Sequence, residues 1–265
     1  MSHIGKEVRL AQIIHQESGT QVCVAMDHSP AIGPVEGMRD IDRAVENVCL
    51  GKPDTIFTHY GVIRKTKQTL MDSGIPFLLS ISTATTFSSD PTHVYLVDSV
   101  LRAVQTGASG VSLRIFLGAE REVEMLKDLA FVIAESEQYG MPVMAMMYPY
   151  GKEVMFDPKA LSHAARIGAE MGVDIVKTYY SGDPESFRRV TESCPVPIVM
   201  SGGPKADNPV DFLANLRGAM DGGAMGVAVG RNAWQHEDPA RMISAINHVV
   251  HDGMRPKDAY DAAFN

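Results

Sequence analysis

The chain has 265 residues, a formal net charge of −8 and a hydrophobic fraction of 45%. This length allows one large α/β domain or two small ones, and the negative charge argues against binding nucleic acid or an anionic membrane. The three cysteines are widely spaced and form no CxxC pair, which favours a reducing compartment. Because no segment resembles a membrane span or a signal peptide, we expect a cytoplasmic protein.

Short apolar runs alternate with amphipathic stretches along almost the whole chain. The runs that predict strands cover residues 21–28, 55–61, 76–82, 110–116, 142–148, 174–180, 197–203 and 226–232. The stretches that predict the following helices cover residues 40–52, 62–74, 93–107, 120–140, 158–172, 183–194, 208–223 and 238–253. Strands that are apolar throughout indicate burial on both faces, and therefore a parallel sheet with helical crossovers.

Eight such units in about 250 residues match a (β/α)8 TIM barrel. A doubly wound open sheet usually has fewer strands, and no dinucleotide fingerprint follows the first strand here. We therefore predict an α/β fold with a single domain over residues 1–265. Its parts would be a short N-terminal helix in residues 1–20, the barrel in residues 21–253 and a short tail in residues 254–265.

Polar residues gather where the predicted strands end. In a TIM barrel these ends and the following loops form the active site. The strand-end residues are Asp27, His28, His59, Tyr148, Lys177, Ser201, Gly202, Gly203, Gly230, Arg231 and Asn232. Arg114 lies within the fourth strand.

The last two strands end in "SGG" and "GR", which predict a phosphate site. Glycines let backbone N–H groups approach phosphate oxygens, and an arginine adds charged donors. The candidate phosphate-binding and substrate-binding residues are Ser201, Gly202, Gly203, Gly230, Arg231, Arg114 and His28. Tight turns with a surface arginine are the alternative, but the pairing of both motifs on strands seven and eight favours phosphate.

Lys177 interrupts the apolar strand "DIVKTYY". A lysine buried there is paired, neutral or just reaching solvent, because an unpaired buried charge is costly. A neutral amine attacks carbonyls to form a Schiff base, and Asp27 or Tyr148 could then act as general acid or base. The structural alternatives are an ion pair for Lys177, a helix cap for Asp27 and a rim position for Tyr148.

The segments "AMDHSPAIGP", "AMMYPYGKEV", "GVDIVKTYYSGD" and "PIVMSGGPK" with "GVAVGRN" carry a resemblance. The chain resembles the archaeal-type class I fructose-bisphosphate aldolase family, and within it the 2-amino-3,7-dideoxy-threo-hept-6-ulosonate synthases. The resemblance implies a metal-independent aldolase or transaldolase without a cofactor, acting on a phosphorylated ketose. It also implies that Lys177 forms the Schiff base, that Tyr148 is the acid/base, that Asp27 assists, and that the chain assembles into a homodecamer.

Three segments depart from that family's pattern. Ser29 stands where a glycine is expected, and Tyr150 replaces an arginine. Arg114 and Phe116 stand where the synthases have histidine and asparagine. We expect Arg114 either to bind a second anionic group of the substrate or to form an internal ion pair, with Asp27 or Glu36 as partner.

Two other functions fit the same residues. One is a lysine-dependent thiolase that cleaves a phosphorylated diketone, of the kind used in signal-molecule catabolism. The other is a non-catalytic sugar-phosphate sensor on a barrel scaffold. A metal-dependent aldolase is disfavoured, because His28, His59 and His163 have no recognisable ligand spacing and His248 and His251 lie on the last predicted barrel helix.

Overall fold

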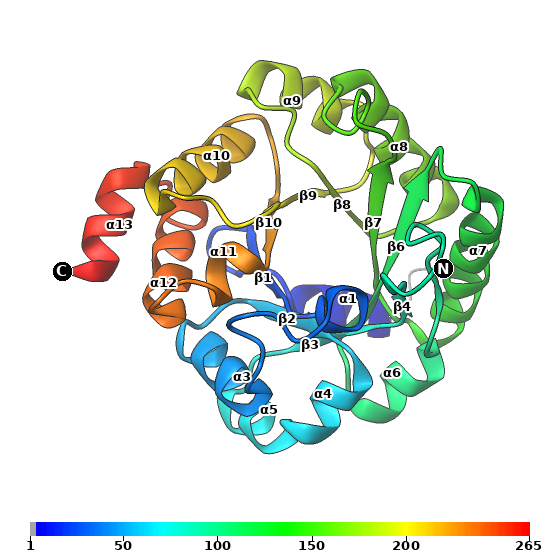
Figure 1. Cartoon of the computed structure of the whole chain (residues 1–265), viewed down its shortest axis with the longest axis horizontal. Helices are drawn as coiled ribbons and strands as arrows, with labels where there is room; N and C mark the ends of the chain where they lie inside the picture. The colour runs from blue at the N-terminus through cyan, green and yellow to red at the C-terminus, as the bar shows by residue number, and fades with distance from the viewer. Residues whose placement is uncertain (1–3) are drawn as a thin grey trace.

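Eight parallel strands form a closed barrel in the computed structural model, which describes residues 4–265. The barrel strands are β1 (Gln21–Ala25), β2 (Thr55–Thr58), β3 (Phe77–Ser80), β6 (Gly110–Leu117), β7 (Val143–Pro149), β8 (Ile175–Thr178), β9 (Ile198–Ser201) and β10 (Gly226–Val229). They follow one another around the ring in chain order, and β10 closes the barrel against β1 (Figure 1). This confirms the predicted TIM barrel.

Helices surround the strands as an outer ring (Figure 1). They are α3 (Ile41–Leu50), α4 (Tyr60–Lys65), α5 (Lys67–Ser73), α6 (Val100–Thr106), α7 (Glu122–Tyr139), α8 (Pro158–Met171), α9 (Pro184–Glu192), α10 (Pro209–Asp221) and α12 (Pro239–Val250). The remaining elements are α1 (Ile4–Gln12), α2 (Ser29–Ile32), α11 (Arg231–Trp234), α13 (Pro256–Phe264) and the antiparallel pair β4 (Ser82–Thr83) and β5 (Tyr95–Leu96).

Helix ends follow the cap residues of the sequence. Asp183, Asn208 and Asp238 each precede a proline, and their side chains accept hydrogen bonds from backbone N–H groups of the first turn. The glycines at 74, 107, 140 and 172 end their helices in the left-handed conformation, which has no steric cost for a residue without Cβ.

Two predicted helices are divided or shortened. The stretch 62–74 forms α4 and α5, which meet at Thr66, whose hydroxyl donates to the carbonyl of Val62 at 2.9 Å. Such back-bonding competes with a straight helix. The helix expected over 93–107 begins only at Val100, because Ser99 caps it and the preceding residues supply β5.

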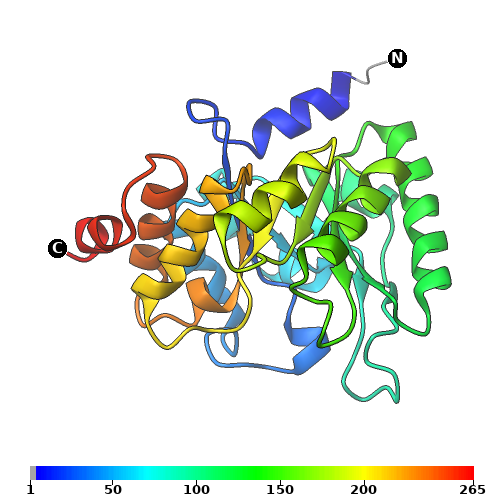
Figure 2. The same cartoon turned by 90° about the horizontal axis from the view of Figure 1, so that it is seen from above.

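The two ends of the chain also differ from the prediction. The N-terminal helix expected over 1–20 spans Ile4–Gln12, and residues 1–3 lie outside the described range. It crosses one end of the barrel (Figure 2), where Ile13 just beyond it is buried in the interior. The region expected as a tail contains α13, which begins at Pro256 and packs against α10 and α12.

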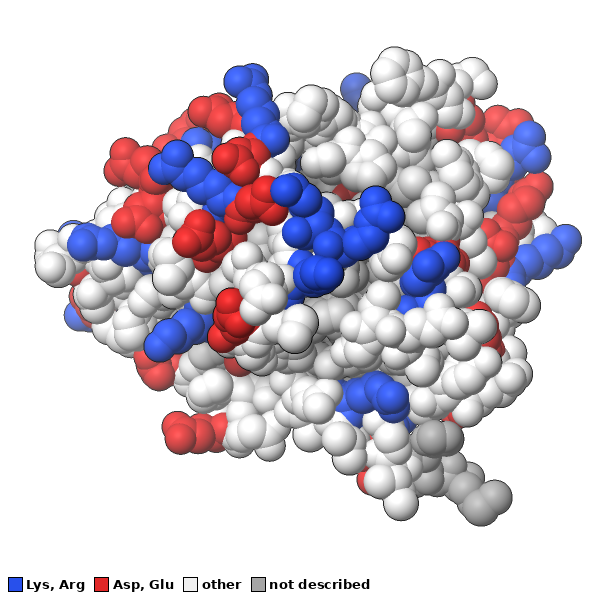
Figure 3. Space-filling view, turned by 90° about the horizontal axis from the view of Figure 1, so that it is seen from below, with Lys and Arg blue, Asp and Glu red and all other residues white. Residues whose placement is uncertain are grey.

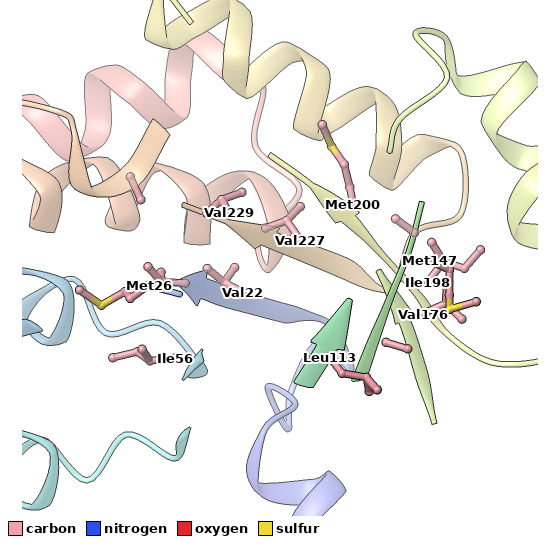
Figure 4. Close-up of a cluster of buried hydrophobic side chains, with 14 of the residues drawn as sticks. Val22, Met26, Ile56, Leu113, Met147, Val176, Ile198, Met200, Val227 and Val229 are labelled. Carbon is pink, nitrogen blue, oxygen red and sulfur yellow. The ribbon is translucent and has the colours of Figure 1, made fainter. Parts of the chain in front are cut away.

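Strand residues alternate between two apolar layers. One side packs outward against the helices, where the branched and methionine side chains of Figure 4 lie, including Val22, Leu113, Val176 and Val227. The other side fills the barrel interior with a separate group: Ile13, Cys23, Ala25, Phe57, Leu78, Met144, Met146, Tyr148, Ile175, Val199 and Ala228. Burial on both faces explains why the strands are apolar throughout.

The outside of the barrel carries charges of both signs. On the face shown in Figure 3, several lysine and arginine side chains gather near the middle, and aspartate and glutamate side chains lie mainly to either side of them. Across residues 4–265 we also find no helix with the length and apolarity that a membrane span requires.

Candidate active site

A cavity of about 180 Å³ lies at the carboxyl ends of the strands. Its walls include ten predicted site residues: Asp27, His28, Arg114, Tyr148, Lys177, Ser201, Gly202, Gly203, Gly230 and Arg231. Four other named strand-end or loop residues do not line it: His59, Tyr150, Asn232 and Glu36. The barrel therefore gathers a set of residues that are far apart in the sequence.

Lys177 points into the barrel interior. The register pairs it with Met146 on one side and Val199 on the other, and both of these belong to the interior layer. Only 5% of the lysine is exposed, its Nζ lies 4.7 Å from the centre of the Phe57 ring, and no residue in the described range forms a hydrogen bond or salt bridge with it. Burial lowers the pKa of Lys177 to about 8, although the Asp27 carboxylate opposes this shift.

Asp27 follows β1 and is also buried. Its Oδ2 lies 3.3 Å from Nη2 of Arg114 and 3.5 Å from the hydroxyl of Ser80. Burial by itself would raise the pKa of this carboxyl, but the nearby cations, with Arg114 the strongest, hold the pKa below its ordinary value. Asp27 is therefore ionised at neutral pH, and Arg114 has the internal partner that the sequence suggested as one alternative.

His28 and Gly230 pack directly against each other. A Cβ at position 230 would lie 2.6 Å from Cε1 of His28 and 3.0 Å from the carbonyl oxygen of Ala25, so a larger residue just after β10 would displace this imidazole. Burial lowers the pKa of His28 to about 4 despite the nearby Asp27, which leaves the ring neutral at neutral pH. The 3.5 Å contact between His28 Nδ1 and Asp27 Oδ1 is therefore not an ion pair under those conditions.

Tyr148 ends the interior face of β7. Its ring stacks on Tyr179 with centroids 4.3 Å apart, and its hydroxyl lies 3.0 Å from Oγ of Ser201. Burial raises the pKa of Tyr148 to about 12, so the phenol keeps its proton throughout the neutral range. Ser201, predicted to bind phosphate, thus has a second role within the site because it orients this hydroxyl.

The "SGG" and "GR" segments lie side by side at the cavity. The N–H of Gly202 lies 3.4 Å from the carbonyl of Ala228, Gly203 has a φ of +67°, and Arg231 borders the cavity. Within residues 4–265, the Nε of Arg231 is buried without a hydrogen-bond partner. A second hollow of about 690 Å³ adjoins this region and shares Tyr179 and Arg231 with the first.

Sequence reasoning did not assign Tyr179 to the site. It lines both hollows, and burial raises the pKa of its phenol above the ordinary range. Strand alternation could have identified it, because it comes two residues after Lys177 and so faces the same side. In the described residues we find no group of three or more His, Cys, Asp or Glu that could hold a metal ion.

Residues 21–236 match the DeoC/LacD family of aldolases, a range that contains every residue of the cavity. The chain belongs to this family. The aldolase is 35% identical over 260 residues to the 2-amino-3,7-dideoxy-D-threo-hept-6-ulosonate synthase of Halobacterium salinarum, covering 98% of this chain and 96% of that protein. It is 33% identical over 256 residues to the 3-hydroxy-5-phosphonooxypentane-2,4-dione thiolase of Klebsiella pneumoniae, covering 97% and 84% of the two chains.

A solved structure is similar over nearly the same range. It is an archaeal fructose-1,6-bisphosphate aldolase with its catalytic lysine covalently bound to a carbinolamine intermediate, and it matches with a TM-score of 0.85 and 29% identity. The match covers 93% of the aldolase and 99% of that structure. The resemblance inferred from the sequence is confirmed: the chain is an enzyme of the class I, Schiff-base aldolase family.

Proposed function

We propose that the aldolase cleaves or forms a carbon–carbon bond in a phosphorylated ketose through a Schiff base on Lys177. The observation that carries this proposal is the state of Lys177, which is buried in the cavity, forms no salt bridge with any residue from 4 to 265 and has a pKa lowered to about 8. A neutral amine fraction is therefore present near neutral pH, as nucleophilic attack on a carbonyl requires.

In the cleavage direction, the amine of Lys177 adds to the ketone carbon, and loss of water from the carbinolamine gives an iminium. A base removes the proton of the hydroxyl on the second carbon from the iminium carbon. The bond between that hydroxyl-bearing carbon and the carbon next to the iminium then breaks, and its electron pair moves toward the iminium to form an enamine. The aldehyde leaves, the enamine is protonated at carbon, and water hydrolyses the resulting iminium to restore the amine.

Tyr148 and Asp27 supply the proton transfers in this scheme. Because Tyr148 retains its proton, it can donate that proton to the alkoxide in the synthetic direction. In cleavage it first gives the proton to the carbinolamine hydroxyl, which leaves as water, and the resulting phenolate then accepts the proton of the substrate hydroxyl. Asp27 stays ionised, so its carboxylate can stabilise the iminium and assist proton transfer at nitrogen. We assign the phosphate to the Gly203 and Arg231 side of the cavity, with Gly202, Gly230 and Ser201 shaping it.

The thiolase function remains a second candidate. Similarity to the Klebsiella pneumoniae thiolase extends over 97% of the chain, and the 690 Å³ hollow beside the cavity offers room for an extended thiol acceptor. The sensor alternative has no such support, because the family consists of enzymes.

A screen of ketose phosphates tests the proposal. Each compound is incubated with the enzyme and the released aldehyde is measured, with and without EDTA and with and without coenzyme A. We expect aldehyde release that EDTA does not change and that needs no coenzyme A. Formation of an acyl-coenzyme A from a phosphorylated diketone, without aldehyde release from any ketose phosphate, would replace the aldolase assignment with the thiolase. Inactivation by EDTA would contradict the metal-independent mechanism.

A further inference from the structure

Asn232 lies behind the proposed phosphate site and forms three hydrogen bonds to one loop. Its Nδ2 donates to the carbonyls of Gly202 at 2.9 Å and Pro204 at 2.8 Å, and its Oδ1 accepts from the N–H of Ala206 at 2.8 Å. The residue is only 6% exposed. An asparagine amide provides two donor hydrogens and one carbonyl oxygen. The side chain therefore uses most of its hydrogen-bonding capacity on the loop between β9 and α10.

These bonds join the two halves of the phosphate site. The loop carries Gly202 and Gly203, whereas Asn232 directly follows Arg231 on α11. The backbone contact between the halves, from Gly202 N–H to the Ala228 carbonyl, is long at 3.4 Å. The side chain of Asn232 therefore forms three short links between the glycine loop and α11, in addition to the bond from Lys205 Nζ to the Gln235 carbonyl at 2.9 Å and the pairing of β9 with β10.

The loop needs such a link to keep one conformation. Gly203 adopts a left-handed φ of +67°, and a Cβ there would meet nothing within 4 Å, so no neighbour packs against that side of the residue. Glycine also has the largest conformational freedom of any residue, and binding weakens when a site must be ordered first.

We propose that Asn232 is a positioning residue that holds the Gly202–Ala206 loop and Arg231 in register for the phosphate of the substrate. This inference rests on the proposed function, because it assumes that the two segments bind phosphate. Asn232 does not line the cavity, so it acts through the loop and not by contact with the substrate.

The test replaces Asn232 with leucine, which has a similar volume, adds no charge and makes no hydrogen bonds. Binding of inorganic phosphate is measured by isothermal titration, and steady-state kinetics are measured with the ketose phosphate found in the screen. We expect Asn232→Leu to weaken phosphate binding and raise KM by about tenfold or more, with a much smaller change in kcat. If this variant fails to fold, Asn232→Ser, which retains one hydroxyl, takes its place with the same expected direction.

Asn247 offers a matched control. Its Nδ2 also donates to two backbone carbonyls, those of Gly51 and Lys52, each at 3.2 Å, and it lies on α12 outside the cavity. Asn247→Leu should reduce thermal stability without changing phosphate affinity. Borohydride trapping of unphosphorylated dihydroxyacetone should be equal in the Asn232 variant and the wild type, because it depends on Lys177 and its proton-transfer partners and not on the phosphate site.

The outcomes separate the inference from the proposed function. A wild type that binds no phosphate contradicts the proposed site and the inference together. A wild type that binds phosphate, with an Asn232 variant that binds it equally well, overturns the positioning role only. Equal loss of phosphate affinity in the Asn247 control would also overturn it, because the effect would then be one of general stability.

Discussion

Tyr148 combines a hydroxyl that keeps its proton with a ring held between neighbouring aromatic residues. Stacking on Tyr179 and the hydrogen bond with Ser201 fix its position, so Tyr148→Phe should remove the proton and leave the ring in place. We expect the Schiff base still to form while kcat falls by about 10²- to 10⁴-fold, the usual range for loss of a general acid or base. Unchanged kcat in stopped-flow and steady-state assays would assign the proton transfer to another group.

Arg114 is the residue for which the structure gives the clearest alternative to substrate binding, since its Nη2 pairs with Asp27 at 3.3 Å. The guanidinium also borders the cavity, and a second anionic group of the substrate could share it. If it does, Arg114→Met should raise KM by about 10- to 150-fold for a doubly anionic substrate, and little for the analogue without the second charge. Equal losses for both compounds would show that Arg114 acts only by holding Asp27.

Most of the site residues could be found from the sequence, because a polar or glycine residue interrupts the apolar run near the end of each strand. Lys177 was conspicuous for this reason, and barrel closure then brought it beside Asp27 and Tyr148. The sequence could suggest that Arg114 pairs with Asp27 but could not decide it. The pairing depends on how the closed barrel brings β6 and β1 to face each other across the interior. The hydrogen bond between Tyr148 and Ser201 has no sequence signal, because many serines follow strands.

At the scale of the elements, helix capping contributes measurably to the free energy of unfolding. Asp183 caps α9 by accepting from Ser186 N–H at 2.8 Å, and it stands outside the cavity. Asp183→Ala should lower the free energy of unfolding by about 1 kcal/mol, as for other N-cap losses. Glu46→Ala, on the exposed side of α3, is the control and should have little effect in chemical denaturation. Equal changes in both variants would contradict the capping role.

The helices could be predicted from the sequence where the spacing of apolar residues, the cap residues and the burial of one face agree, as in α8, α9, α10 and α12. The helices were harder to predict where a local hydrogen bond competes with the helical backbone. At Thr66 the threonine hydroxyl interrupts the helix, although the spacing of apolar residues continues past it. The C-terminal α13 lies in residues 254–265, which the sequence predicts as a short tail. Its single fully buried residue, Ala259, and its packing on α10 and α12 depend on tertiary contacts that no local pattern reveals.

For the whole molecule, large apolar side chains remain exposed on several helices. Those more than half exposed include Ile4 and Val8 on α1, Leu50 on α3, Met71 on α5, and Val123 and Phe131 on α7. Together with the family resemblance, this supports our proposal that the chain forms a homodecamer. Sedimentation velocity should give a mass ten times the 28.8 kDa of the chain. A monomer at micromolar concentration would contradict the decamer without affecting the chemistry at Lys177.

The central claim is that Lys177 forms the Schiff base, and reductive trapping tests it most directly. The enzyme is incubated with a substrate ketose phosphate, reduced with borohydride and mapped by peptide mass spectrometry, with Lys177→Met as the matched variant. We predict an adduct on Lys177 alone, forming faster as the pH rises toward about 8 because the amine loses its proton, and no adduct in the variant. An adduct on another lysine, or turnover by Lys177→Met, would contradict the account.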